Sequence, residues 1–131
     1  MAYLGKEYKL QSQENFEEFV NALGAVTITQ SYAHKPSSKL VQNGDTYTLS
    51  SSKPDGSFTE LVFKNGVPFD DTAYGQAKTT VTVDGNVVTQ VQKFAKSGAT
   101  LTIKREYNGD QLQATITASV WDGAARRYYK A

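Results

Sequence analysis

Regularly spaced glycines are the feature that most constrains the fold of this chain. From Pro36 onward they recur nine to fourteen residues apart, mostly beside Asn, Asp or Ser, which favour tight turns. Asp84-Gly85 has the composition of a type I′ hairpin turn, and the rhythm as a whole is typical of an antiparallel meander. Eight turns separate nine strands, and the stretch Tyr3–Leu10 supplies a tenth. The turn glycines are Gly44, Gly56, Gly66, Gly75, Gly85, Gly98, Gly109 and Gly123.

Ten short strands joined by tight turns favour a closed barrel over a sandwich. The meander has no long crossover connection, and closure removes the exposed strand edges that promote aggregation. A barrel of eight strands just holds one small ligand, so ten strands leave room for an internal cavity. A chain of 131 residues is one domain by length, residues 1–131. The prediction is an all-β fold, a ten-stranded antiparallel up-and-down β-barrel.

The helical patterns in the sequence lie between the first two predicted strands. Within residues 15–24 the apolar side chains fall at the i, i+3, i+4 and i+7 spacing of one helix face. Asn15 is the expected N-cap and Gly24 the expected stop. A second short helix is expected over residues 26–33, ended by Pro36. Both helices are expected in the connection between the first and second strands.

Charge and composition exclude several classes of function. The 14 basic and 13 acidic residues leave a net charge of +1, too little to steer the protein toward nucleic acid or an acidic membrane. Without cysteine there is no disulfide framework and no thiolate chemistry. The N-terminus shows no apolar signal core, and no run approaches the ~18 apolar residues of a membrane span. We therefore expect a cytoplasmic protein.

Residues with catalytic potential do not combine into a known pattern. His34 is the only histidine, so a metal site or a Ser-His-Asp relay has no support in the sequence. Asp70 and Asp71 are adjacent, and neighbouring residues of a strand point to opposite faces. There is no glycine-rich phosphate motif and no nucleophile elbow. We expect no enzymatic activity, no metal and no cofactor.

Arg105 lies on the apolar face of a predicted strand. It alternates with Leu101, Ile103 and Tyr107, while polar residues occupy the other face. An interior arginine cannot lose its charge and needs partners, so this placement indicates an anion site. The alternative is that Arg105 reaches water at the end of the strand, beside Asn108-Gly109. The sequence alone leaves both open.

The chain ends in a basic and aromatic run, Arg126-Arg-Tyr-Tyr-Lys-Ala. Strand alternation places Arg127 with Tyr129 on one face and Arg126 with Tyr128 on the other, but it does not say which pair points inward. Either pair could bind an anion inside the barrel. A contrasting interpretation is a surface patch for membranes or nucleic acid, whose binding would depend strongly on salt.

Short motifs along the whole chain fall in the order and spacing of one protein family. They include Tyr3-Leu-Gly-Lys-x-Tyr, Glu14-Asn-Phe-x-x-Phe, Gly66-Val-x-Phe-Asp, Gln90-Val-Gln-Lys-Phe and Lys104-Arg-Glu-Tyr-Asn-Gly-Asp. On these motifs the chain resembles the cytosolic fatty-acid-binding proteins of the intracellular lipid-binding family, its insect and moth members in particular. The resemblance implies a β-clam with a helix-turn-helix lid at about residues 15–34. It also implies a monomer that carries one long-chain fatty acid, binds no nucleic acid and touches membranes transiently through the lid.

The same resemblance assigns residues to the carboxylate and to the cavity. The family's inner arginine falls on Arg105, its inner glutamine on Gln92, and Phe94 stands where many relatives have Trp. The moth-type ending favours Arg127 and Tyr129 as the carboxylate clamp. A retinoid or another hydrophobic acid in the same barrel is the alternative ligand. Further residues expected to line the cavity are Ser38, Phe16, Leu61, Phe63 and Ile103.

Overall fold

Ten antiparallel strands form one continuous sheet, in the order β4-β3-β2-β1-β10-β9-β8-β7-β6-β5. The computed structural model describes residues 3–16, 18–19, 37–52, 57–71, 77–95 and 98–131. The predicted all-β architecture of ten strands is confirmed. The strands are β1 (Glu7–Glu14), β2 (Ser37–Asn43), β3 (Thr46–Ser52), β4 (Phe58–Lys64), β5 (Phe69–Asp71), β6 (Ala77–Asp84), β7 (Val87–Phe94), β8 (Thr100–Asn108), β9 (Gln111–Ala118) and β10 (Trp121–Lys130).

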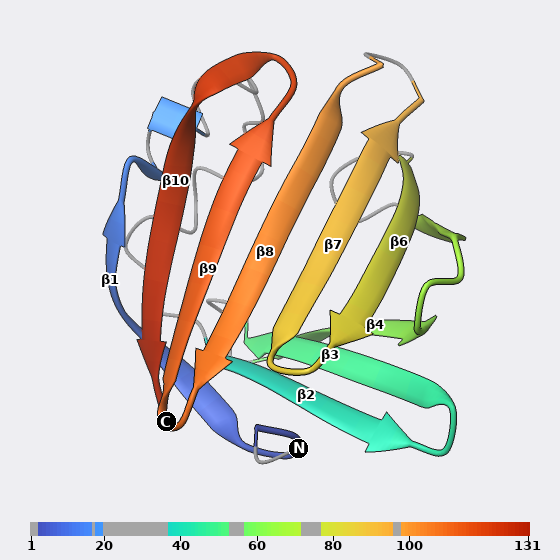
Figure 1. Ribbon diagram of the computed structural model, residues 1–131, viewed down its shortest axis with the longest axis vertical. Coiled ribbons are helices and arrows are strands. Elements are labelled where there is room, and N and C mark those ends of the chain that lie inside the picture. The colour runs from blue at the N-terminus through green and yellow to red at the C-terminus, as the bar shows by residue number, and fades with distance from the viewer. Residues whose placement is uncertain (1–2, 17, 20–36, 53–56, 72–76, 96–97) are drawn as a thin grey trace.

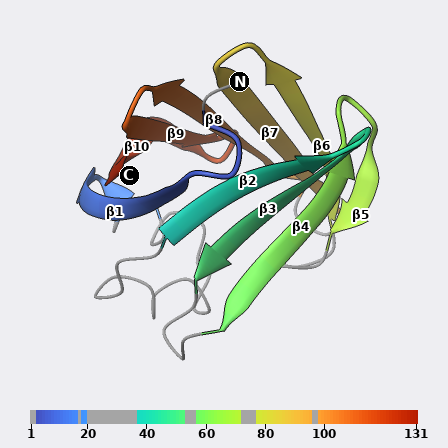
Figure 2. The ribbon, with the colours of Figure 1, turned by 90° about the horizontal axis from the view of Figure 1, so that it is seen from below.

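The sheet curves back on itself into a nearly closed barrel. Figure 1 shows β6 to β10 side by side as one wall, with β2, β3 and β4 crossing beneath them at a steep angle. Seen from below, the two walls face each other across the interior (Figure 2). Because alternate side chains of each strand point inward, the curvature gathers the buried residues between the walls.

Asn65, in the turn after β4, forms hydrogen bonds that join this edge of the sheet to β6. β4 and β5 are the two ends of the strand order, so the sheet is not paired between them. The Asn65 side chain accepts a hydrogen bond from the Val83 N–H at 2.8 Å and donates one to the Val83 carbonyl at 3.0 Å. The Gly66 N–H donates to the Val81 carbonyl at 2.8 Å. The turn after β4 is thereby attached to β6.

The first strand differs from its predicted range, Tyr3–Leu10. Residues 3–5 form a turn in which the Lys6 N–H donates to the Tyr3 carbonyl at 3.2 Å, and the strand begins at Glu7. Pairing with β10 then shifts between Leu10 and Ser12, which is a β-bulge. The bulge lets the strand continue to Glu14, beyond the predicted end.

Gly123 was predicted in a turn and lies instead within β10. The turn that precedes β10 is Ser119–Val120, and the pairing of β10 with β9 is irregular between Trp121 and Ala125. A Cβ atom on Gly123 would lie 2.6 Å from the Trp121 indole. Glycine is therefore needed for close approach of the ring to the backbone, a role that turn statistics do not reveal.

The hairpin between β6 and β7 also differs from its predicted type. Asp84 pairs with Val87, so the two loop residues are Gly85 and Asn86. Gly85 has φ of +60°, and Asn86 is not among the residues with positive φ. Positive φ at the first loop position alone is the pattern of a type II′ turn, not the predicted type I′.

The predicted first helix is described at its start. Phe16, Glu18 and Phe19 are helical, and the Phe19 N–H donates to the Asn15 carbonyl at 3.0 Å. Residue 17 and residues 20–36 lie outside the described residues, and with them most of the predicted lid, the second helix and His34. Within the described ranges, no helix is long and apolar enough to cross a membrane.

Candidate functional site

Two arginines lie in one row across the interior face of the sheet. Arg105 of β8 pairs with Ala114 of β9, Ala114 pairs with Arg127 of β10, and Arg127 pairs with Gln13 of β1. Directly paired residues of antiparallel strands share a face. Because Ala114 is only 4% exposed, that face is the interior. Both arginines are therefore on the inner side of the barrel.

Arg126 and Tyr128 of the C-terminal run face outward. Arg126 pairs with the exposed Glu14, and the Tyr128 hydroxyl donates to a Glu14 carboxylate oxygen at 3.2 Å. Tyr129, by contrast, pairs with the buried Leu10 and Leu112. The strand register thus places Arg127 and Tyr129 inside and separates them from their outer neighbours.

The guanidinium of Arg127 is held on two sides. Its Nε donates to Oε1 of Gln13 at 3.2 Å, and its Cζ lies 4.3 Å from the centre of the Phe16 ring and 5.9 Å from that of Tyr129. The ring contacts are cation–π interactions. Its Nη2 atom is buried and has no hydrogen-bond partner. A charged donor in a fixed position therefore remains open to an acceptor.

Arg105 has a neutral partner. Its Nη1 donates to Oε1 of Gln90 at 2.9 Å, and Gln90 is 4% exposed. Within the part of the chain described, neither Arg105 nor Arg127 forms an ion pair with a carboxylate. The interior accordingly carries two permanent positive charges that neutral amides solvate.

Gln90 is the interior residue that sequence reasoning missed. Gln92 was expected beside Arg105, but it pairs with Leu101, whereas Arg105 pairs with Val88. Gln92 is itself buried, at 1% exposure, one step further along the same face of β7. Gln90 and Gln92 share one face of β7, so strand periodicity contained the signal. Gln90 lies two residues from Val88, the direct partner of Arg105, and is therefore a diagonal neighbour of the arginine, whereas Gln92 lies four residues away.

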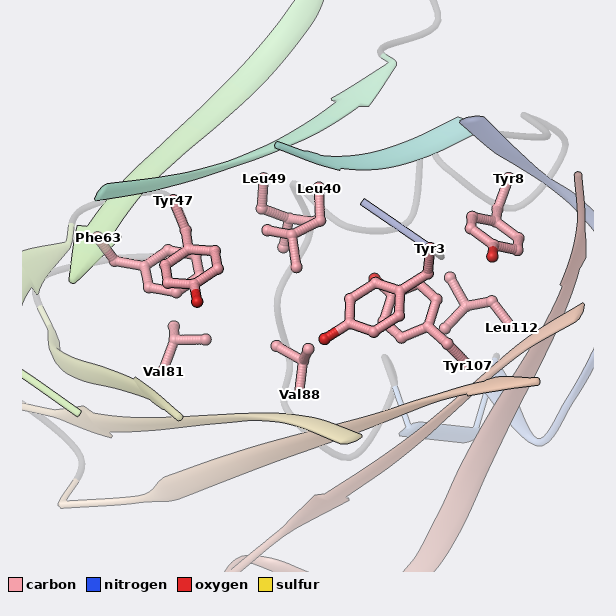
Figure 3. Close-up of a cluster of buried hydrophobic side chains, with 10 residues drawn as sticks. All are labelled: Tyr3, Tyr8, Leu40, Tyr47, Leu49, Phe63, Val81, Val88, Tyr107 and Leu112. Atoms are coloured by element: carbon pink, nitrogen blue, oxygen red, sulfur yellow. The ribbon is translucent and has the colours of Figure 1, made fainter. Parts of the chain in front are cut away.

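The polar row lies between two apolar clusters. Phe63 belongs to the cluster shown in Figure 3, and Leu61 packs against it. Phe16 belongs to the other cluster, and Phe94 and Ile103 pack against it. Ser38 is buried as well. The cluster in Figure 3 consists of Tyr3, Tyr8, Leu40, Tyr47, Leu49, Phe63, Val81, Val88, Tyr107 and Leu112. The second consists of Phe16, Phe19, Leu101, Ile116, Ala118 and Ala125.

A hollow of about 600 Å³ lies near the turn between β8 and β9. Gln113 in its lining pairs with both Glu106 and Tyr128 on the outward face, and Tyr107 and Tyr129, whose positions face inward, line it as well. Neither Arg105 nor Arg127 lines it. Among the described residues, no three or more His, Cys, Asp or Glu side chains gather where they could hold a metal ion. The row that contains Arg105 and Arg127 is therefore the candidate binding site.

The relatives of this chain among known proteins are fatty-acid-binding proteins. No protein-family model matches the chain. Fatty acid-binding protein 1 of Manduca sexta is 53% identical and fatty acid-binding protein 2 of the same moth 49% identical, each over 100% of both chains.

Solved structures agree with the sequence comparison. The fatty-acid-binding protein isolated from Manduca sexta superposes with a TM-score of 0.88 at 47% identity, covering 98% of this chain and 99% of the other. A Schistosoma mansoni fatty acid binding protein in complex with arachidonic acid superposes with a TM-score of 0.84 at 28% identity, covering 98% and 94%. The predicted resemblance is confirmed, and the chain belongs to the fatty-acid-binding protein family.

Proposed function

We propose that this protein is a cytoplasmic carrier that holds one long-chain fatty acid inside the barrel, with the carboxylate at Arg127. The observation that carries the proposal is the buried Nη2 atom of Arg127, a charged donor without a hydrogen-bond partner. A desolvated guanidinium is stabilised by an anion, and its planar fork matches a carboxylate. The fatty-acid-binding names of the relatives support the same ligand class.

Tyr129 and Arg105 complete the proposed carboxylate site. Tyr129 lies two residues from Arg127 on the same face, with its ring 5.9 Å from the guanidinium carbon, so its hydroxyl is a candidate second donor. Arg105 lies two strands away in the same row and remains paired with Gln90. One carboxylate leaves one cation in excess. We propose that Gln90, Gln92 and ordered water solvate this second cation.

Apolar burial supplies most of the proposed affinity. A sixteen-carbon chain gains on the order of 12 kcal/mol at about 0.8 kcal/mol per methylene, before ordering costs of several kcal/mol or more. The charge-assisted hydrogen bonds add about 1.5–3 kcal/mol. Phe16, Phe94 and Ile103 on one side and Leu61 and Phe63 on the other are the proposed contacts of the chain. The arginine therefore selects acids over alcohols, while the tail sets the strength of binding.

Extraction of the purified protein, followed by mass spectrometry, tests the ligand class. The proposal predicts co-purified long-chain fatty acids and binding that salt changes little. A matched competition between oleic acid and oleyl alcohol tests the head group, with the acid expected to bind about tenfold more tightly or better. Equal binding of acid and alcohol would overturn the carboxylate site. Displacement by retinoic acid in preference to oleic acid would instead identify a retinoid carrier.

A further inference from the structure

The hydroxyl of Tyr107 is a second buried polar group without a partner. The Tyr107 side chain is 3% exposed, and its hydroxyl oxygen is buried and makes no hydrogen bond. Its ring stacks on Tyr3 at 4.2 Å between centroids and meets the edge of Tyr8 at 5.3 Å. These contacts fix the direction in which the hydroxyl points.

The hydroxyls of the two neighbouring tyrosines, unlike that of Tyr107, each form a hydrogen bond. The Tyr3 hydroxyl donates to the Gly85 carbonyl at 2.7 Å, and the Tyr8 hydroxyl donates to the Gly109 carbonyl at 2.8 Å. Both acceptors are backbone carbonyls in turns, one between β6 and β7 and the other between β8 and β9, at the same end of the sheet (Figure 1). Tyr107 sits between them and points elsewhere. In Figure 3 its hydroxyl is directed away from β8, across the cluster toward Leu40.

The backbone of Tyr107 allows little adjustment. Its N–H donates to the Asn86 carbonyl at 2.9 Å, and its carbonyl accepts from Nδ2 of Asn86 at 2.9 Å. Burial raises the pKa of the Tyr107 hydroxyl to about 12, so the group is a neutral phenol at ordinary pH. A neutral hydroxyl among apolar side chains is costly unless an acceptor or donor reaches it.

The strand register relates this hydroxyl to the proposed carboxylate site. Tyr107 lies two residues beyond Arg105 on the same face of β8, and Arg105 is two strands from Arg127. With ~4.8 Å between strands and ~3.4 Å per residue, the Cα atoms of Tyr107 and Arg127 are about 12 Å apart. Tyr107 is thus closer to Arg105 than to Arg127, and a ligand oxygen that bonds with Tyr107 while the carboxylate bonds with Arg127 lies along the ligand chain and not on its head.

We propose that the interior accepts fatty acids that carry a second oxygen in mid-chain, a hydroxyl or keto group, whose oxygen forms a hydrogen bond with the Tyr107 hydroxyl. The inference rests on the proposed fatty-acid carrier and adds a second polar position to it. Oleic acid and ricinoleic acid are a matched pair of probes, because they share the chain and the double bond and differ by one mid-chain hydroxyl.

Tyr107→Phe removes the hydroxyl and keeps the ring and its stacking on Tyr3. We expect this variant to bind ricinoleic acid about five- to tenfold more weakly than the wild type does, while its affinity for oleic acid changes by about twofold or less. Oleic acid hydroxylated next to the carboxyl should show no such loss, because that oxygen lies at the head. Tyr128→Phe, on the outward face, is the control variant and should affect neither probe.

If Tyr107→Phe folds poorly, the affinities of the wild type for ricinoleic acid and oleic acid still test the inference. An interior in which no polar group reaches the middle of the ligand would bind ricinoleic acid about tenfold or more less tightly than oleic acid, because the ligand hydroxyl would lose its hydration without compensation. We expect the two acids to bind with similar affinity. A large preference for oleic acid, or equal losses of both acids in Tyr107→Phe, would overturn the inference and leave the carrier function intact. Binding of neither acid by the wild type would overturn the carrier function itself.

Discussion

The guanidinium of Arg127 lies over the ring of Phe16, with 4.3 Å between the guanidinium carbon and the ring centre. The Phe16 ring is 6.0 Å from that of Phe19, which is 5.8 Å from that of Trp121. This aromatic series joins the segment after β1 to the start of β10. The proposed carboxylate site is thus braced by packing as well as by the Gln13 hydrogen bond.

Replacing Phe16 with leucine should weaken the binding of acids selectively. The change removes the cation–π contact that holds Arg127 and leaves an apolar side chain of similar volume. We expect calorimetric titration to show a loss of about two- to tenfold for oleic acid and a smaller loss for oleyl alcohol. Equal losses for both ligands would mean that Phe16 contributes only apolar contact.

Asn65→Ala should lower the free energy of unfolding by about 1–2 kcal/mol. The change removes both hydrogen bonds to Val83, each of which contributes roughly 0.5–1.5 kcal/mol net. Urea denaturation is the measurement. Asn43→Ala alters an exposed asparagine that also precedes a turn glycine, and it should cost less. A loss as large at Asn43 would show that turn propensity, and not the bridge to β6, accounts for the effect.

Gly123→Ala should destabilise the barrel by about 1–3 kcal/mol, because the new methyl group would collide with the indole of Trp121. The protein contains a single tryptophan, so fluorescence during thermal unfolding reports on the same region. In a double-mutant cycle the cost of Gly123→Ala should largely disappear in a Trp121→Leu background. A cost that persists there would place the strain in the backbone of β10.

Tyr107 should make the stability of the wild type sensitive to high pH. Burial raises the pKa of this hydroxyl from 10.0 to about 12, with smaller increases from Tyr3 and Tyr8 and an opposing effect of Arg105. A group with a raised pKa in the folded state stabilises fully below its unfolded pKa and loses that contribution as pH rises through the folded value.

We therefore expect the free energy of unfolding of the wild type, relative to Tyr107→Phe, to fall by about 2 kcal/mol between pH 9 and pH 12. Urea denaturation of the two proteins at each pH supplies the difference and cancels the titration of other groups. Parallel pH profiles would contradict the assignment of this pKa increase to burial of Tyr107.

The strands and most turns were predictable because their signals are local. Asn-Gly and Asp-Gly pairs and alternating apolar residues depend on neighbours in sequence. Two of the departures, the bulge after Leu10 and the placement of Gly123 inside β10, depend on pairing between the chain ends and on the Trp121 ring. The pairing of β1 with β10 joins residues far apart in sequence, and the approach of the Trp121 ring to Gly123 depends on side-chain packing, which residue spacing does not show.

The interior polar row was only partly predictable for the same reason. Alternation placed Arg105 with apolar neighbours, but it could not decide between Arg126 and Arg127, because tyrosines follow on both faces. The pairing of Arg127 with Ala114 decides which residue faces inward. The partner of Arg105 is its diagonal neighbour on β7, which the register of β7 and β8 determines, and this is why Gln90 was missed in favour of Gln92.

Isothermal titration of oleic acid into the wild type, Arg127→Ala and Arg126→Ala tests the central claim most directly. The two variants remove the same charge from adjacent positions of β10, one facing the interior and the other facing Glu14. We predict that Arg127→Ala weakens binding about ten- to hundredfold, whereas Arg126→Ala changes it by about twofold or less. Equal losses, or a larger loss in Arg126→Ala, would contradict the assignment of the carboxylate to Arg127.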